Sequence, residues 1–323
     1  MKQMLVIFAA VVLAEQPILA EDKEPLISDP FVEKAIRRSL KKPEGELTEA
    51  DLAKVTSLFL AFTKITDDSL KEVAKLKMLT ELILAGTQIT DAGLKEVAKL
   101  QQLTNLNLSR TKITDASLKH IAKLQQLTEL GLLSTQTTDA GLKELANLEN
   151  FRSLVLSSKI TDEGLKEVAK FQQLTSLTVS GPQITDKGLK EVAKLQKLTE
   201  LYLMFTQITC AGIEEFEKLK QLEELNLYGS KISDIGLKEV AKLQNLRLLD
   251  LTATPITDEG LKEVAKLQKM SNLALFNTKI TDACLKDVAK LQQLDYLFIK
   301  GTQITDAGVA ELKKVLPKCR ILR

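Results

Sequence analysis

The chain has 323 residues, of which 44% are hydrophobic and 4% aromatic, and it contains no tryptophan. Its 45 lysines and arginines nearly balance its 43 aspartates and glutamates, and the basic residues fall on predicted helices instead of forming a stripe. This distribution predicts no nucleic-acid partner. A single histidine, His120, and three scattered cysteines predict no metal site, no cofactor and no catalytic centre.

Residues 1–20 predict a secretory signal peptide. One lysine precedes an apolar run over residues 4–14, and Ala14 and Ala20 are two candidate cleavage positions. The run is too short to cross a bilayer, so no stable membrane span is predicted. This interpretation predicts a secreted, periplasmic or cell-envelope protein. The alternative is a buried or frayed N-terminal strand.

Residues 21–54 predict an N-terminal helical cap. Asp29 is a candidate N-cap, Pro30 suits the first helical position, and apolar residues follow at helical spacing as far as Leu40. Residues 47–52 then read as a shortened form of the repeat described next. Such a cap covers the apolar side chains that the first unit of an array leaves open.

Residues 55–316 contain eleven units with a period of 24 residues. Nine steps between units are of 24 residues and one is of 23. A fixed period of this length is typical of a repeat array. The tripeptide Ile-Thr-Asp begins at residues 65, 89, 113, 160, 184, 208, 232, 256, 280 and 304, and residues 137–139 supply the remaining copy as Thr-Thr-Asp.

One unit shows what the period builds. In residues 103–108 the last two leucines alternate with polar residues, which predicts a short strand with one buried face. Thr114 and Asp115 then offer two helix N-caps, which explains the repeated aspartate better than calcium binding does. Leu118 and Ile121 continue a buried helical face. Because the next strand follows only 24 residues later, each strand must lie beside the last in a parallel sheet.

The pattern LxxLxLxxTxIT followed by a helix resembles the leucine-rich repeat. The resemblance implies an α/β leucine-rich-repeat solenoid with a curved parallel sheet on the concave face and helices on the convex face. Its ITDAGLKEVAKL helix is similar to those of bacterial envelope-associated, internalin-like proteins and to the cysteine-containing repeats of F-box proteins. Such proteins are binding scaffolds. The usual ladder asparagine is replaced by threonine or serine, whose hydroxyl we expect to bond the neighbouring turn, at residues 63, 87, 111, 135, 206, 230, 254, 278 and 302.

Residues 317–323 predict a C-terminal cap, because residues 316–322 read as a truncated strand segment. The cysteines are predicted to be free and partly buried. Cys210 and Cys284 lie three units apart, about 14 Å at ordinary strand spacing, which is too far for a disulfide. Cys319 lies more than one unit beyond Cys284.

Exposed positions differ in how much they vary between units. Six helices carry LKEVAK unchanged, beginning at residues 70, 94, 165, 189, 237 and 261. The strand position between the two inner leucines differs in nearly every unit, although it also faces solvent, and this difference favours a ligand on the concave face. Eight of the 13 aromatic residues occupy predicted outward strand or strand-end positions, with six of them in the second half. The predicted partner-binding residues are Tyr202, Met204, Phe205, Asn226, Tyr228, Asp250, Phe276, Tyr296 and Phe298.

These observations predict a non-enzymatic scaffold that binds another protein on its concave face. Three alternatives stay open. The tyrosines suit a glycan or peptidoglycan ligand, which the absence of tryptophan weakens. An F-box-like adaptor needs an additional helical module, for which residues 21–54 are too short. An enzyme needs a cluster of catalytic groups, and none is visible in the sequence. Separately from these three alternatives, the aromatic rings also suit packing on one another across neighbouring strands.

Overall fold

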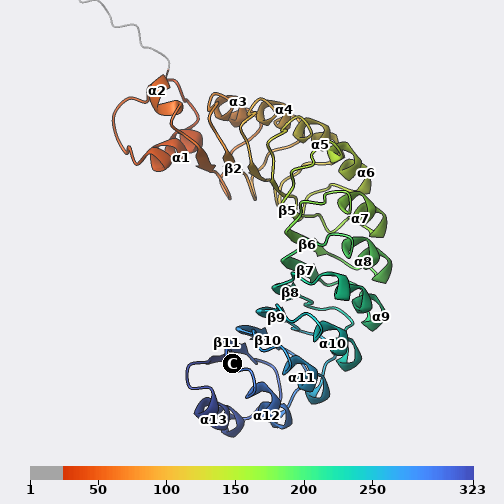
Figure 1. Ribbon diagram of the computed structural model, residues 1–323. Coiled ribbons are helices and arrows are strands. Elements are labelled where there is room, and N and C mark those ends of the chain that lie inside the picture. The colour runs from red at the N-terminus through yellow and green to blue at the C-terminus, as the bar shows by residue number, and fades with distance from the viewer. Residues whose placement is uncertain (1–24) are drawn as a thin grey trace, which may run out of the picture.

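The computed structural model describes residues 25–323, which form one 12-stranded parallel sheet in chain order. Figure 1 shows a curved array with the strands on its inner, concave side and the helices on its outer, convex side. The predicted fold class is therefore confirmed. The strands are β1 Ser57–Phe59, β2 Glu81–Ile83, β3 Asn105–Asn107, β4 Glu129–Gly131, β5 Ser153–Val155, β6 Ser176–Ser180, β7 Glu200–Met204, β8 Glu224–Asn226, β9 Leu248–Asp250, β10 Asn272–Ala274, β11 Tyr296–Phe298 and β12 Arg320–Leu322.

No helix within residues 25–323 is long and apolar enough to cross a membrane.

Short helices cover the convex side, and two more precede the sheet. The helices are α1 Pro30–Leu40, α2 Glu49–Leu52, α3 Ser69–Val73, α4 Leu94–Val97, α5 Asp115–Ile121, α6 Asp139–Leu142, α7 Asp162–Val168, α8 Asp186–Val192, α9 Cys210–Ile213, α10 Asp234–Val240, α11 Asp258–Val264, α12 Leu285–Val288 and α13 Asp306–Val315, with 3-10 turns η1 Lys143–Leu145, η2 Glu214–Lys218 and η3 Asp282–Cys284.

A continuous core of leucine, isoleucine and valine runs between the sheet and the helices. In the unit that contains β3, Leu106 and Leu108 are fully buried from the strand, and Leu118 is fully buried from the helix. Asn105 and Asn107 alternate with these leucines and point away from the core. Each unit shares this core with both neighbours, so its burial is complete only when the units stack.

The repeated aspartate has a different role from the predicted one. Thr114 is the N-cap of α5, since its side chain accepts a hydrogen bond from the amide of Ala116. The preceding aspartate, Asp91, reaches across to the next unit and accepts bonds from the amide and hydroxyl of Thr114 at 2.8 and 2.7 Å. The prediction that the aspartate caps its own helix is therefore wrong. The same bonds recur from Asp67, Asp115, Asp139, Asp162, Asp186, Asp234, Asp258 and Asp282.

This aspartate ladder breaks once. Cys210 stands where the other units have aspartate, and its sulfur lies 3.2 Å from the hydroxyl of Ser233. Ser233 makes no side-chain capping bond for α10. A helix glycine makes room for the carboxylate of the preceding unit, because a Cβ atom on Gly188 would clash with Oδ1 of Asp162.

The ladder threonines bond within their own unit. Thr111 donates its hydroxyl to the carbonyl of Leu108 at 2.6 Å, and Thr87 bonds Leu84 in the same way. The prediction that these hydroxyls bond the neighbouring turn is wrong at these positions, because the corner folds each hydroxyl back onto its own strand. Ser230 is the exception, since its buried hydroxyl oxygen has no partner.

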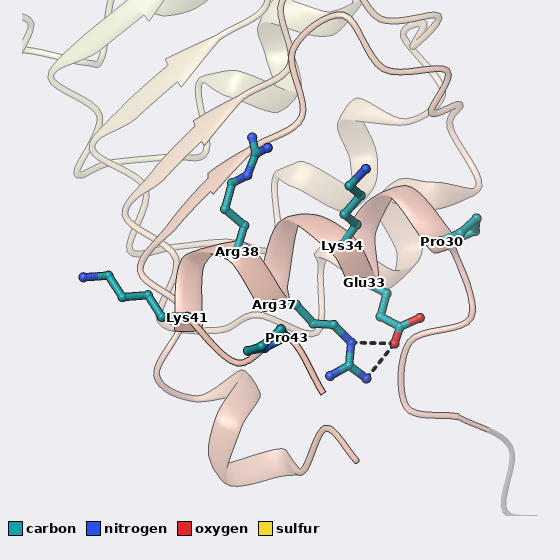
Figure 2. Close-up of a pocket in the computed structure, with 7 residues that line it drawn as sticks. All are labelled: Pro30, Glu33, Lys34, Arg37, Arg38, Lys41 and Pro43. Carbon is teal, nitrogen blue, oxygen red and sulfur yellow. Dashed lines mark hydrogen bonds and ion pairs between the residues drawn. The ribbon is translucent and has the colours of Figure 1, made fainter. Parts of the chain in front are cut away.

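The N-terminal helix closes the first unit of the array. Asp29 caps α1 by accepting from the amides of Phe31 and Val32, as predicted. Asp29 also accepts from the hydroxyl of Ser69 in α3, which ties α1 to the first unit. On α1 itself, Arg37 pairs with Glu33 at 2.8 Å (Figure 2).

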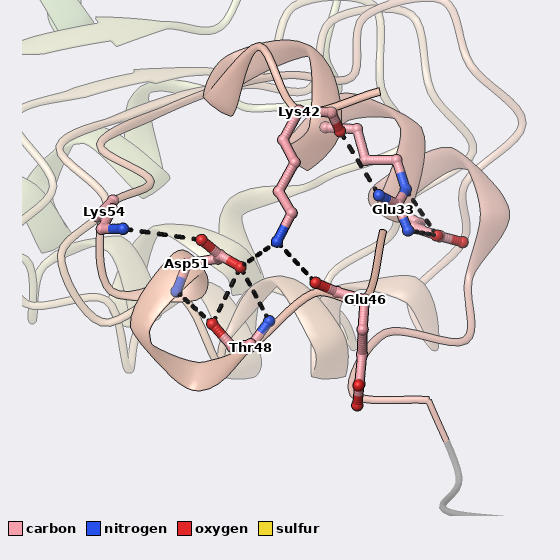
Figure 3. Close-up of polar contacts among 7 residues, drawn as sticks. Glu33, Lys42, Glu46, Thr48, Asp51 and Lys54 are labelled. Atoms are coloured by element: carbon pink, nitrogen blue, oxygen red, sulfur yellow. Dashed lines mark hydrogen bonds and ion pairs between the residues drawn. The ribbon is translucent and has the colours of Figure 1, made fainter. Parts of the chain in front are cut away.

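A second polar network holds the loop between α1 and α2. Lys42 donates to Asp51 at 2.8 Å and to the carbonyl of Glu46, while Thr48 and Asp51 form a capping box at α2 (Figure 3). The hydrogen bond from Lys42, with the amide of Thr48, lowers the pKa of Asp51 far below its usual range. The predicted boundaries at residues 54 and 316 stay predictions, and the predicted signal peptide lies outside the described residues.

Candidate functional site

Register aligns the variable strand positions into one row across the concave face. Phe59 pairs with Ile83 at one end, and Phe298 pairs with Leu322 at the other. Neighbouring residues in such a row are about 4.8 Å apart, close enough for side chains to touch. The row consists of Phe59, Ile83, Asn107, Gly131, Val155, Thr178, Tyr202, Asn226, Asp250, Ala274, Phe298 and Leu322.

Four of the predicted residues gather on β7 and in the segment that follows β8; we call Tyr202, Met204, Phe205 and Tyr228 the central aromatic cluster. The rings of Phe205 and Tyr228 lie 4.5 Å apart with planes tilted by 56°. The hydroxyl of Tyr202 donates to Glu224. Burial first, and the hydrogen bond to Glu224 second, raise the pKa of Tyr202. Phe205 stays 53% exposed in spite of its contact with Tyr228.

Phe205 holds an unfavourable backbone conformation. Its φ is +56°, in the left-handed region, which costs roughly 1–2 kcal/mol for a residue with a Cβ atom. The corner after most strands uses this conformation, and glycine occupies it four times. Burial of about half of the ring offsets a comparable amount, since full burial of a phenylalanine side chain is worth about 1.5–3 kcal/mol. The residues with positive φ at this corner are Phe62, Gly86, Arg110, Ser134, Gly181, Phe205, Gly229, Ala253, Asn277 and Gly301.

A second group lies nearer the C-terminus; we call Phe276, Tyr296 and Phe298 the C-terminal aromatic cluster. The rings of Phe276 and Phe298 meet edge to face at 5.5 Å, and those of Tyr296 and Phe298 stack at 6.3 Å. The guanidinium of Arg320 sits 5.8 Å from the centre of the Tyr296 ring. Contacts along β11 and with the segment that follows β10 therefore hold all three rings, and each stays partly exposed.

A polar pair separates the two clusters. Asn226 donates from its side-chain amide to Asp250 at 2.9 Å across β8 and β9. Each of these side chains also accepts from the backbone two residues later, at Tyr228 and Thr252. The nine predicted residues are thus brought together as two aromatic clusters and one polar bridge.

Sequence reasoning missed two residues of this face. Glu224 precedes Asn226 by two residues, so strand alternation places both on the same side. The sequence alone could therefore have predicted that Glu224 lies on the concave face. Arg320 lies in β12 and pairs in register with Tyr296. Arg320 reaches Tyr296 only because β12 pairs with β11 in the sheet, and this pairing was not predicted.

The remaining reactive groups lie away from this face. Among residues 25–323, no group of three or more histidine, cysteine or acidic side chains is arranged to hold a metal ion. The three cysteines are free, with Cys284 and Cys319 buried. Burial raises the pKa of Cys284 to about 12 and that of Cys319 to about 11. Burial and nearby lysines lower the pKa of His120.

Comparison with known proteins agrees with the repeat architecture. Two leucine-rich repeat family models match residues 196–256 and residues 75–98. No sequence among the curated proteins matches the chain. The family is generally one of protein–protein interaction domains and typically non-enzymatic scaffolds.

Solved structures share the fold. An internalin (InlF) from Listeria monocytogenes has a TM-score of 0.61 at 23% identity, over 92% of this chain and 95% of its own. A leucine-rich repeat protein of Leptospira interrogans has a TM-score of 0.56 at 24% identity, over 84% of this chain and 73% of its own. At 23% and 24% identity, these similarities show a shared fold only. The chain carries leucine-rich repeats and folds as a solenoid that resembles that of the Listeria internalin.

Proposed function

We propose that this protein is a non-enzymatic scaffold that binds another protein through the concave face between residues 202 and 298. The observation that carries the proposal is the central aromatic cluster. Aromatic side chains that are held rigidly and left partly exposed are typical anchors of protein interfaces. Phe205 is held by the corner and by its contact with Tyr228, and 53% of its surface stays exposed to a partner.

Packing between the rings is compatible with binding. The contacts of Phe205 with Tyr228 and of Phe276 with Phe298 fix the side chains before a partner arrives. Fixed side chains lose less conformational entropy on binding. The Asn226–Asp250 bridge offers polar atoms between two apolar patches, an arrangement that suits a protein surface of mixed character.

Export is part of the proposal. The apolar run over residues 4–14, which lies outside the described residues, supports a secreted, periplasmic or cell-envelope location. Detection of the mature chain in the medium, the periplasm or the envelope fraction agrees with this proposal. A full-length chain that stays in the cytosol contradicts it.

The binding test uses substitutions that other units already tolerate. Tyr202→Thr copies Thr178, Phe298→Asn copies Asn226, and Phe276→Thr copies Thr252. Tyr228→Ser copies the serine of β6 at residue 180. The combined variant should keep its helical signal and melting transition while losing partners that the parent captures. A matched control carries serine at the exposed convex residues Lys95, Lys119, Lys143 and Lys190.

Unchanged capture by the concave-face variant contradicts the proposal. Loss of capture by both variants indicates a general defect in the fold or a different surface. A glycan array on the purified parent separates the second ligand class, because glycan binding that disappears in the concave-face variant assigns the same face to a carbohydrate.

A further inference from the structure

A groove of about 520 Å³ lies at the N-terminal end of the array, between α1 and the segment that follows β1. It is distinct from the concave region at residues 202–298. Helix α1 contributes Phe31, Lys34 and Arg38, and the first unit of the sheet contributes Phe59, Phe62 and Lys64. Figure 2 shows Lys34 and Arg38 projecting from one side of α1, with Glu33 and Arg37 on another.

The three rings of this groove are unusually exposed. Phe31 is 39% exposed, Phe59 57% and Phe62 70%. Among residues 25–323 only eight large hydrophobic side chains are exposed, and three of them line this one groove. Contiguous exposed apolar residues in a hollow mark an interaction site more often than scattered single ones.

The basic groups of the groove lack carboxylate partners. Within residues 25–323, Lys34, Arg38 and Lys64 form no ion pair. Their neighbours Arg37 and Lys42 are paired with Glu33 and Asp51, each at 2.8 Å. No acidic residue lines the groove, so its charge is uncompensated.

The backbone corner at Phe62 fixes the position of its ring. Its φ is +59°, and the next unit has Gly86 at the same corner. The ring lies over Gly86, where a Cβ atom would meet Phe62 Cδ1 at 2.6 Å. The corner conformation, which most other units share, therefore holds this ring in place while 70% of its surface stays open to a partner.

We propose that this groove binds an acidic segment of another protein, with an apolar side chain between the rings of Phe31, Phe59 and Phe62. Carboxylates on either side of that anchor pair with Lys34, Arg38 and Lys64. A peptide fits better than an anionic membrane, because the rings line a hollow of about 520 Å³ that can receive a single apolar side chain. The groove is a second surface that shares no residue with the region 202–298, so its test is independent of the test of the concave-face proposal.

The test selects peptides from a phage-displayed library of random 12-residue sequences on the full chain, then measures their synthetic forms by fluorescence anisotropy. One variant carries Lys34→Glu, Arg38→Glu and Lys64→Glu. A second carries Phe62→Gly, which suits the positive φ and removes the ring without backbone strain. The matched control reverses charge at Lys95, Lys119 and Lys190, which are exposed on convex helices and unpaired within the described chain.

Selected peptides should contain acidic residues around an apolar one and should bind the parent more weakly as salt rises. Each groove variant should weaken binding at least about tenfold, while the control stays within about twofold. The proposal is overturned if acidic peptides are not enriched, or if both groove variants bind them as the parent does. It is also overturned if the groove variants lose binding only to vesicles of phosphatidylglycerol and phosphatidylcholine, since that outcome assigns the groove to a lipid surface.

Discussion

The phenyl ring of Phe205 lies over Gly229, the residue at the same corner of the next unit. A Cβ atom on Gly229 would come within 2.8 Å of Phe205 Cδ1. Both residues have positive φ, +56° and +68°. The glycine therefore leaves the space that the most exposed ring of the central aromatic cluster occupies. A larger residue at position 229 would displace this ring.

Gly229→Ala should destabilise the protein and displace the ring. Alanine at positive φ costs roughly 1–2 kcal/mol, and the contact with Phe205 adds to this. The expected loss in the free energy of unfolding is about 2–3 kcal/mol, measured by urea denaturation. Since all three tyrosines belong to the two aromatic clusters and tryptophan is absent, near-ultraviolet circular dichroism should change as well.

Gly45→Ala is the matched control for this prediction. Gly45 also has a positive φ, +84°, but its nearest outside atom would be the Lys42 Cε at 3.6 Å. Only the conformational cost of roughly 1–2 kcal/mol should then appear, with no tyrosine signal. Equal losses for the two variants, with no spectral difference, contradict the coupling between Gly229 and Phe205.

Cys210→Asp should stabilise the protein. It restores the aspartate ladder at its one break, where the hydroxyl of Ser233 contacts only the weakly hydrogen-bonding sulfur of Cys210 and makes no capping bond. Hydrogen bonds to a carboxylate are worth about 1.5–3 kcal/mol, and desolvation removes part of that, so a gain of about 1–2 kcal/mol is expected. Cys210→Ser removes the thiol without supplying a carboxylate and should leave stability near that of the parent. A destabilised aspartate variant contradicts the prediction.

Acid should weaken the ladder. The hydroxyl and amide of Thr305 hydrogen-bond Asp282 and lower its pKa. A depressed folded-state pKa gives stability that is present above the unfolded value of about 3.9 and is lost as pH falls through the folded value. Asp282→Asn should be less stable than the parent at pH 7 and should lose less stability between about pH 4 and pH 2. Parallel stability curves for the two proteins contradict this assignment.

Ser230→Ala should be close to neutral, whereas Thr254→Ala should destabilise. The buried hydroxyl of Ser230 has no partner, so its removal takes away an unsatisfied group. The hydroxyl of Thr254 bonds Leu251 at the same corner of the next unit, and its loss should cost about 1–2 kcal/mol. Equal effects on the midpoint of thermal unfolding contradict this difference.

Sequence was sufficient for the repeat and its layers because those depend on local spacing. The buried leucines and the candidate N-caps Thr114 and Asp115 follow from residues within one unit, and the parallel sheet follows from the 24-residue step between units. The hydrogen bond that Thr114 donates to Asp91 could not be predicted in this way. Its donor and acceptor lie 23 residues apart and meet only after the units stack.

The candidate site was predictable as a set of outward positions, but its internal organisation was not. Alternation along β7 indicates that Tyr202 and Met204 share a face. The positive φ of Phe205 and Phe62 cannot be predicted from residue type, because arginine, serine, alanine and asparagine also occupy this corner. The ring contacts depend on side-chain rotamers that spacing does not determine.

Site-directed photocrosslinking tests the concave-face proposal most directly. A benzoylphenylalanine replaces Tyr228 or Phe298 on the concave face, or Lys166 or Lys238 on the convex helices, in cells that produce the protein. We expect both concave positions to give the same covalent partner and the convex positions to give none. Adducts that form equally or preferentially at Lys166 and Lys238 would contradict the proposal that the concave aromatic clusters bind a protein.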